Sequence, residues 1–375
     1  MKVAIDIRRA GDYGIGTYVR NVVNQLARQD RENSYLLIGS QTHLAQLDPL
    51  PENFRLLDYP PAPGSFRTHL HLPVVLDQQR VQVLHMPWLY APALVPCRLV
   101  ITVHDLTELV YGAQGSRLVQ AGRLRFARRA LRRASRILAV SHTAGRELAR
   151  VFRIPEEKIE VTYNALDERF TREPFPADAD RVLERHAVNY PFLLYAGNIK
   201  PQKNLARLIE AFAVAKAELA DHPELGSLKL IVIGDELARH PDLRRAVTRT
   251  RMREDVRFLG FVQPNVLRVF YGRARAFVFP SLYEGFGLPP LEAMAHGTPV
   301  VTSSISSLPE TVGPAALLVN PENVFDIARG IRQVLVNDEL RQQLIHRGYE
   351  LVQKYSWERT AAQILRVYQS AASSS

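Results

Sequence analysis

The sequence predicts an α/β protein built from two Rossmann-like domains, and three observations lead to that prediction. Short apolar runs alternate with segments of helical spacing along the chain, as in parallel sheets that carry helices on both faces. The alternation is interrupted by a polar, charged segment over residues 164–190. A length of 375 residues exceeds what one ordinary core accommodates and suits two domains.

The first half of the chain supplies one complete set of strands. We expect them over residues 2–6, 35–39, 54–58, 81–85, 98–104, 136–140 and 159–163. A helix over 14–27 follows a glycine-containing turn, and Ser141 is a suitable N-cap for a helix that ends near Phe152. We place the first domain at residues 1–170.

A second set begins after a lead-in helix over 179–186. Strands are expected over residues 192–197, 228–234, 256–259, 276–280, 299–302 and 315–320, and helices over 204–219, 324–337, 339–354 and 357–370. We place the second domain at residues 185–354.

Composition narrows the class of protein. The net charge of +10 predicts an acidic partner, but no known nucleic-acid-binding module is present, so we expect no nucleic acid. Cys97 is the single cysteine, so no disulfide forms within the chain. The first residues do not resemble a signal peptide, and no apolar run reaches the roughly 20 residues that cross a bilayer. We expect a cytoplasmic protein, with contact at the inner face of a membrane as an option.

The most informative stretch covers residues 276–303. Glu284 and Glu292 stand eight positions apart where a loop meets a short helix, and Pro289 and Pro290 suit the first turn of that helix. Three backbone amides would then point outward from the helix N-terminus, those of Phe286, Gly287 and Leu288. Such an end binds anions, and the two carboxylates could hold hydroxyl groups on either side. A ligand with hydroxyls on both sides of a diphosphate is a nucleotide sugar.

The run from Glu284 to Glu292, continued through residues 293–301, resembles the Glu-x7-Glu motif of the retaining glycosyltransferases of family 4. These enzymes have the GT-B fold, in which two Rossmann-like domains face each other across a cleft. The resemblance implies that the first domain binds the acceptor and the second binds the donor. It also implies that the last helix, residues 357–372, crosses back to the first domain.

Candidate residues in the first domain lie at strand ends. Gly14 and Gly16 fit either a flexible turn or a close approach of the backbone to a diphosphate. His104 ends a buried strand, at the edge where ligands bind in open α/β sheets, although a capped strand end is the alternative. The resemblance favours a donor-binding role for both glycines and places His104 beside the transferred sugar. His85 could line the acceptor cleft, whereas His142 is expected to face solvent.

The segment 197–204 opens the second domain with lysines placed just before a helix. These can present cations and amides to a phosphate, and a solvated turn is the alternative. The resemblance implies that Asn198 and Lys203 bind the donor, with Lys203 as a catalytic cation. Family members commonly carry an arginine where Asn198 or Gln202 stands, and Arg273 or Lys200 could compensate for its absence.

Two further glycines, Gly197 and Gly234, end neighbouring strands of the second domain. Either can be an ordinary β–α turn, and the resemblance assigns both to the donor site. Nothing in these turns separates guanine from uracil or adenine.

Four arginines have the spacing of one helical stripe: Arg125, Arg129, Arg132 and Arg136. A stripe of this kind could contact an anionic membrane, which suits a lipid-linked acceptor. A solvated helix face is the alternative.

The resemblance implies a metal-independent hexosyltransferase that needs no cofactor. Glu284 would orient the sugar, Glu292 would hold the ribose and Lys203 would stabilise the leaving diphosphate. The sequence has neither an Asp-x-Asp signature nor paired histidines at metal-ligand spacing.

The segments 197–204 and 283–290 look most like mannosyl-type members, which suggests GDP-mannose as donor and a growing polysaccharide or lipid-linked glycan as acceptor. A nucleotide-sugar 2-epimerase, a sugar phosphorylase and a non-catalytic nucleotide-sugar-binding protein stay open as alternatives.

Overall fold

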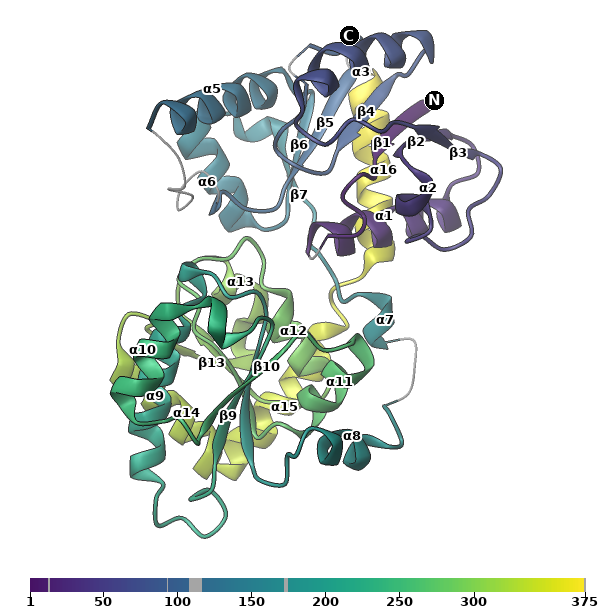
Figure 1. Ribbon diagram of the computed structural model, residues 1–375. Helices are drawn as coiled ribbons and strands as arrows, with labels where there is room; N and C mark the ends of the chain where they lie inside the picture. Colours follow the sequence, from purple (N-terminus) through teal and green to yellow (C-terminus); the bar gives the residue numbers. More distant parts are fainter. Residues whose placement is uncertain (13, 93, 108–116, 172–174, 374–375) are drawn as a thin grey trace. The chain divides into compact units, whose positions relative to one another are not determined.

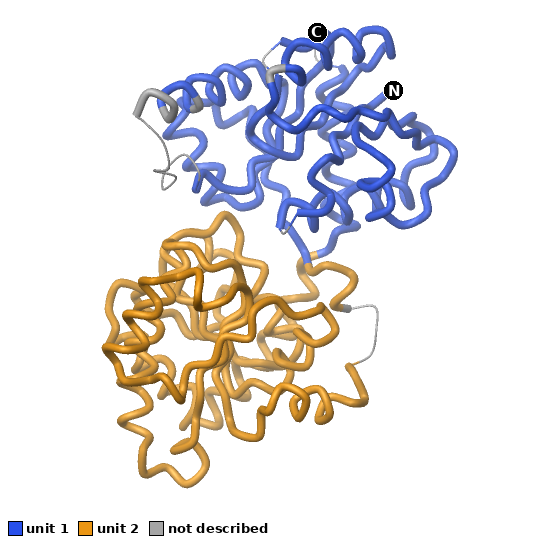
Figure 2. The backbone as a smooth tube through the Cα atoms, in the orientation of Figure 1, with its two compact units in different colours: residues 1–165, 356–375 blue, residues 166–355 orange. Residues whose placement is uncertain are grey.

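The computed structural model describes the chain except for residues 13, 93, 108–116, 172–174 and 374–375 (Figure 1). The chain forms two compact units (Figure 2). Unit 1 comprises residues 1–165 and 356–375, and unit 2 comprises residues 166–355. The chain therefore passes from one unit to the other twice. Within the described ranges, no helix is both long enough and apolar enough to cross a bilayer.

Unit 1 is built on a parallel sheet with the strand order β3-β2-β1-β4-β5-β6-β7. Its strands are β1 (Lys2–Asp6), β2 (Ser34–Gly39), β3 (Phe54–Asp58), β4 (Val83–Met86), β5 (Arg98–Val103), β6 (Arg136–Ala139) and β7 (Ile159–Val161). The order reverses between β1 and β4, and such a switch point leaves a crevice at the carboxyl ends of the strands.

Helices cover both faces of this sheet. They are α1 (Ile15–Gln29), α2 (Gln41–Leu44), α3 (Phe66–Gln78), α5 (Arg117–Arg133), α6 (His142–Phe152), α16 (Trp357–Ser373) and the 3-10 turn η1 (Glu156–Lys158). The hydroxyl of Ser141 caps α6 by accepting the amide of Ala144 at 3.0 Å. The crossing of the last helix is confirmed, because α16 packs against α1, β4 and β5 and buries Trp357 and Tyr368.

Unit 2 repeats the arrangement with the strand order β10-β9-β8-β11-β12-β13, again parallel. Its strands are β8 (Phe192–Ala196), β9 (Lys229–Ile233), β10 (Val256–Gly260), β11 (Ala276–Phe279), β12 (Val300–Ser303) and β13 (Ala316–Val319). β8 and β11 flank the switch point. Both are buried along their whole length because helices cover both faces.

The helices of unit 2 are α7 (Glu168–Thr171), α8 (Ala179–Arg185), α9 (Leu205–Glu218), α10 (Pro241–Thr250), α11 (Pro264–Arg273), α12 (Leu288–Ala295), α13 (Leu308–Val312), α14 (Val324–Val336) and α15 (Asp338–Val352), with 3-10 turns η2 (Pro201–Lys203), η3 (Leu237–Arg239) and η4 (Gly313–Ala315). α8 packs against α11 through Ala179, Val182 and Val269. The two-domain α/β fold predicted from the sequence is thus confirmed.

Candidate active site

The predicted donor residues of unit 2 gather at its switch point. Gly197 and Asn198 follow β8, and the loop to Glu284 follows β11. Since β8 and β11 are paired and parallel, both segments leave the sheet at the same carboxyl edge. This edge is where an open α/β sheet presents ligand-binding groups.

The backbones of two strand-ending glycines approach each other closely here. Gly234 has a φ of 152°, and a Cβ placed on it would lie 2.0 Å from the carbonyl oxygen of Gly197. No side chain fits in that space. Glycine at position 234 therefore allows the residue after β9 to approach the residue after β8 closely at the carboxyl edge of the sheet.

Lys203 and Glu284 form an ion pair at this edge. The Nζ atom of Lys203 lies 2.5 Å from Oε1 of Glu284, and their side chains are 16% and 11% exposed. The ammonium group also lies 5.3 Å from the ring centroid of Phe279, at the end of β11. The predicted cation and carboxylate are thus in direct contact and mostly withdrawn from water.

The loop that carries Glu284 is fixed from several directions. Asn204 has a left-handed φ of 62°, and its amide Nδ2 donates to the carbonyls of Pro280 and Pro321 at 3.0 and 2.7 Å. The hydroxyl of Ser303 donates to the carbonyl of Ser281 at 2.6 Å. Side chains at the start of α9 and the end of β12 therefore set the course of the backbone just before Glu284.

The helix after this loop begins at Leu288, one residue earlier than the prolines alone suggest. Gly287 is its N-cap with a φ of 99°, and a Cβ there would lie 2.6 Å from Cδ2 of Leu308. Pro289 and Pro290 follow in the first turn, where their missing N–H groups cost nothing. No hydrogen bond joins the amides of Gly287 and Leu288 to an acceptor in the described part of the chain. They are suited to an external anion.

Glu292 lies on α12 in a half-buried position. The hydroxyl of Tyr271, on α11, donates to its Oε2 at 2.9 Å. Burial raises the pKa of Glu292 to about 7. The hydrogen bond from Tyr271 and the charge of Arg169 act against that rise, and the charge of Asp167 adds to it. The carboxyl group is therefore poised to change charge near neutral pH.

In unit 1, His104 follows β5 and is half-buried. Its Nε2 lies 3.0 Å from the carbonyl of Pro87, and its ring meets Tyr18 edge-on at 4.9 Å between centroids. Burial lowers the pKa of His104 to about 4, so the ring is neutral at pH 7. Because a carbonyl only accepts, Nε2 carries the proton and Nδ1 is left as an acceptor.

Gly14 and Gly16 lie at the same edge of the unit 1 sheet as His104, at the start of α1. Gly14 is the N-cap with a φ of 70°. A Cβ on Gly16 would lie 2.6 Å from the carbonyl oxygen of Ala10, so this turn tolerates no side chain there. The structure thus brings these two glycines to the carboxyl edge, as the sequence predicts.

The prediction that His85 lines an acceptor site is wrong. His85 is fully buried, with Nδ1 2.6 Å from the hydroxyl of Tyr368 and Nε2 2.7 Å from the hydroxyl of Thr102. Burial lowers its pKa to about 3. His85 therefore ties β4 to β5 and to α16. His142 is exposed, as expected.

The prediction that Arg273 compensates for the missing arginine is also wrong. Arg273 ends α11, which leads into the amino end of β11, so it lies at the opposite edge of the sheet from Lys203. Its guanidinium pairs with Asp180 on α8 at 2.8 Å. Lys200 and Asn198 are exposed at the carboxyl edge.

The predicted arginine stripe is shorter than expected. α5 ends at Arg133, so Arg136 lies in β6, where its Nη2 donates to the hydroxyl of Ser370 at 3.1 Å. Arg125, Arg129 and Arg132 are exposed on α5. The sequence does not reveal the break because the charge pattern continues past the end of the helix.

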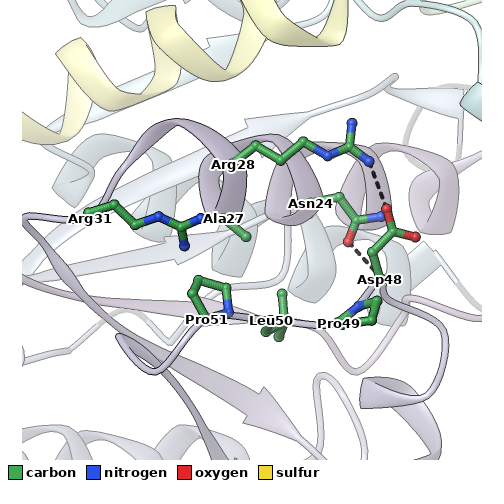
Figure 3. Close-up of a pocket in the computed structure, with 8 residues that line it drawn as sticks. All are labelled: Asn24, Ala27, Arg28, Arg31, Asp48, Pro49, Leu50 and Pro51. Atoms are coloured by element: carbon green, nitrogen blue, oxygen red, sulfur yellow. Dashed lines mark hydrogen bonds and ion pairs between the residues drawn. The ribbon is translucent and has the colours of Figure 1, made fainter.

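Two hollows in unit 1 contain none of the predicted site residues. One, of about 320 Å³, lies between the last turn of α1 and residues 48–51, where Arg28 pairs with Asp48 at 2.7 Å (Figure 3). The last turn of α1 leads to the amino end of β2, so this hollow is at the wrong edge for the candidate site. The other, of about 460 Å³, lies beside β7 and is lined by His142, Tyr163 and Gln363 among others.

Sequence reasoning missed the residues that hold the carboxylates in place. Tyr271 lies on α11, a helix for which the sequence analysis makes no prediction. The serines at 306 and 307 contact the backbone of Glu284. The only sequence signal for them is their position in the turn that follows the strand β12. The described residues hold no group of three or more histidine, cysteine or acidic side chains arranged for a metal ion.

Two family models match the chain: "Glycosyltransferase Family 4" over residues 13–170 and "Glycosyl transferases group 1" over residues 177–351. O-antigen chain mannosyltransferase B of Escherichia coli is 32% identical over 291 residues, which cover 76% of this chain and 74% of the relative. Serotype-specific mannosyltransferase WbdA, also of Escherichia coli, is 32% identical over 71% of this chain and 33% of its own length. Among solved structures, HepE of Anabaena in complex with UDP and glucose matches with a TM-score of 0.77 and 19% identity, over 99% of this chain and 100% of that one.

Proposed function

The chain belongs to glycosyltransferase family 4, among the group 1 glycosyltransferases, and from this premise we propose that it moves a mannosyl unit from GDP-mannose to a glycan or lipid-linked acceptor. Its fold is of the GT-B type. Mannose is proposed because the two relatives from Escherichia coli named above are mannosyltransferases. The observation that carries the proposal is the Lys203–Glu284 pair at the carboxyl edge of unit 2, next to the N-terminus of α12.

In the proposed reaction the bond between the anomeric carbon and the phosphate oxygen breaks while the acceptor oxygen bonds to the same face of that carbon. The acceptor proton passes to the departing phosphate. Lys203 and the amides at residues 286–288 would take up the negative charge that develops on the diphosphate, which is the largest kind of catalytic contribution. No metal ion is required in this scheme.

The two carboxylates have separate tasks in this proposal. Glu284 would accept hydrogen bonds from the sugar hydroxyls and balance positive charge at the anomeric carbon. Glu292 would accept from the ribose hydroxyls. In unit 1, Nδ1 of His104 would accept from a sugar hydroxyl, because its neutral ring has that lone pair available.

A product assay tests the proposal. The purified protein is mixed with GDP-mannose and an oligomannoside primer, and released GDP and extended primer are measured, with UDP- and ADP-sugars as comparisons. We expect GDP release that depends on the primer and persists in EDTA, and a new linkage with the donor's anomeric configuration. Glu284→Ala should abolish transfer, whereas Glu339→Ala, which removes an exposed carboxylate on α15, should not.

Each alternative predicts a different result in the same assay. A 2-epimerase would act on the donor without a primer, and a phosphorylase would need inorganic phosphate. A binding protein would bind the nucleotide sugar without turning it over. Full activity of Glu284→Ala would remove this residue from the mechanism.

We also propose that α5 contacts an anionic membrane. Arg125, Arg129 and Arg132 are exposed, and the helix carries no acidic residue. Each arginine near such a surface contributes about 1 kcal/mol. Flotation with vesicles containing phosphatidylglycerol should be lost in the triple Arg→Glu variant and at high salt, but kept when the exposed Arg244 and Arg245 on α10 are reversed instead. Equal binding of both variants would contradict the assignment.

A further inference from the structure

Ser306 adopts a backbone conformation that residues with a side chain rarely occupy. Its φ is 62°, in the left-handed region, where the Cβ atom crowds the backbone. The residue lies in the turn between β12 and α13, at the same carboxyl edge of the sheet as Glu284. Strain of this kind persists where the surrounding structure enforces it, and it concentrates at functional sites.

The side chain of Ser306 bonds to both backbone groups of Glu284. The amide of Glu284 donates to Oγ of Ser306 at 3.0 Å, and the same Oγ donates to the carbonyl of Glu284 at 2.8 Å. One hydroxyl thereby uses its donor and one of its acceptor positions on a single residue. Oγ of Ser307 adds a bond to the same carbonyl at 2.9 Å.

The left-handed conformation and these two bonds depend on each other. A change of φ at Ser306 swings its Cβ around the chain, so the hydroxyl reaches Glu284 only from the backbone position that it now occupies. Glycine would adopt this φ without strain, but it has no hydroxyl. Serine at position 306 therefore has a strained backbone conformation, and in that conformation its hydroxyl fixes the backbone of Glu284.

We propose that Ser306 is a positioning residue for the Glu284 carboxylate. It anchors the backbone from which that side chain extends toward Lys203, and so fixes where the carboxylate meets the donor sugar. The inference rests on the function proposed above, because it needs Glu284 to act on the sugar. It adds a residue outside the Glu-x7-Glu motif that the proposed chemistry requires.

Glycine substitution separates this role from a purely structural one. Ser306→Gly removes the hydroxyl and the strain together, whereas Ser306→Ala removes the hydroxyl alone. Arg251 supplies the matched control. It has a φ of 60° at the end of α10 in the same unit, and its side chain is exposed. Arg251→Gly therefore relieves the same strain without touching the Glu284 loop.

The measurements are kcat, KM for GDP-mannose, the Kd of GDP and the Tm of each variant. We expect kcat to fall about tenfold or more in both Ser306 variants, since small displacements of a catalytic group cost that much. The Kd of GDP should equal that of wild type in both Ser306 variants, because Lys203 and Glu292 are unchanged. The Tm of Ser306→Gly should equal or exceed that of wild type and should exceed that of Ser306→Ala, and Arg251→Gly should gain Tm with kcat unchanged.

Two results would overturn the assignment. One is an unchanged kcat in Ser306→Gly while Glu284→Ala is inactive. The other is a Tm of Ser306→Gly far below wild type, which would mean that the hydroxyl holds the fold and not the site. Full activity in Glu284→Ala would instead remove Glu284 from the mechanism, and this inference with it, whereas absence of transfer by the wild-type protein would remove the proposed function.

Discussion

The ammonium group of Lys203 lies 2.5 Å from the carboxylate of Glu284, across the switch point of the unit 2 sheet. The two side chains come from segments 81 residues apart. Their mutual neutralisation lets both charges be held mostly out of water. A donor diphosphate at this edge would compete for the ammonium group, and its sugar would lie against the carboxylate.

The first prediction concerns this pair. Lys203→Met should lower kcat about a hundredfold, as removal of one charge-stabilising donor typically does. It should also lower Tm, because Glu284 is left as an unpaired, mostly buried charge. Glu284→Gln added to Lys203→Met should restore much of the Tm and none of the activity. Glu224→Gln, in an exposed pair with Arg275, is the control and should leave both quantities close to wild type.

A second prediction follows from the raised pKa of Glu292. Below its ordinary value of 4.5 the carboxyl is protonated in both the folded and the unfolded chain. Between 4.5 and about 7 the folded protein keeps a proton that the unfolded chain has lost, so stability from this group falls as pH rises through about 7. Glu292→Gln stays neutral, so its Tm relative to wild type should be higher at pH 8 than at pH 5. An equal Tm difference at both pH values would contradict the raised pKa.

The charged or titratable groups around Glu292 are the hydroxyl of Tyr271, Asp167 and Arg169, and Nδ1 of His296 meets its main-chain carbonyl at 2.7 Å. A third prediction concerns the first of them. The hydrogen bond from Tyr271 lowers the pKa of Glu292, so Tyr271→Phe should raise that pKa further. If ribose hydroxyls donate to the ionised carboxylate, KM for GDP-mannose at pH 7 should rise several-fold while kcat changes less.

The pH profile of kcat/KM provides the check on Tyr271. As pH increases, kcat/KM should rise when Glu292 ionises, and in Tyr271→Phe this rise should occur at a higher pH than in wild type. At pH 9 Glu292 is ionised in both proteins, so their KM values should become equal. Tyr190→Phe, which alters a tyrosine hydroxyl that accepts from Arg257 outside the site, is the control. A uniform loss of kcat/KM at every pH would show that Tyr271 supports packing and not the charge state of Glu292.

Much of this architecture is readable in the sequence because parallel sheets buried on both faces produce continuous apolar runs. The strands of both sheets fall within a few residues of their predicted places for that reason. α3 escaped prediction because Pro73 stands inside it, and proline normally ends a helix. The apolar runs mark where the strands end, and this was enough to place Lys203, Glu284 and His104 in segments that follow strands. Because the carboxyl ends of parallel strands share one sheet edge, such segments within one sheet lie at the same edge.

Residues whose meaning depends on a distant contact could not be read in this way. His85 and His104 both end apolar strands, and nothing local tells the buried one from the half-buried one. His85 is closed off by Tyr368, a residue 283 positions away. Likewise, Ser306 and Tyr271 acquire their roles only when folding brings them to Glu284 and Glu292. The sequence predicts the acids, and the structure identifies what holds them.

The last prediction concerns the contact that ties α16 to unit 1. The hydroxyl of Tyr368 lies 2.6 Å from Nδ1 of His85, and both residues are fully buried. Tyr368→Phe leaves a buried ring nitrogen without its partner, which costs about 1–3 kcal/mol. Thr102 still holds the other nitrogen at 2.7 Å, so the loss should stay local and the fold should survive. Since neither residue belongs to the candidate site, kcat and KM at 25 °C should equal those of wild type while Tm falls by several degrees. Gln363→Ala, which removes a half-exposed contact of the same helix to β7, should lower Tm less. A loss of activity in Tyr368→Phe at temperatures where the variant is folded would contradict this prediction, because it would mean that the contact of α16 with His85 affects catalysis as well as stability.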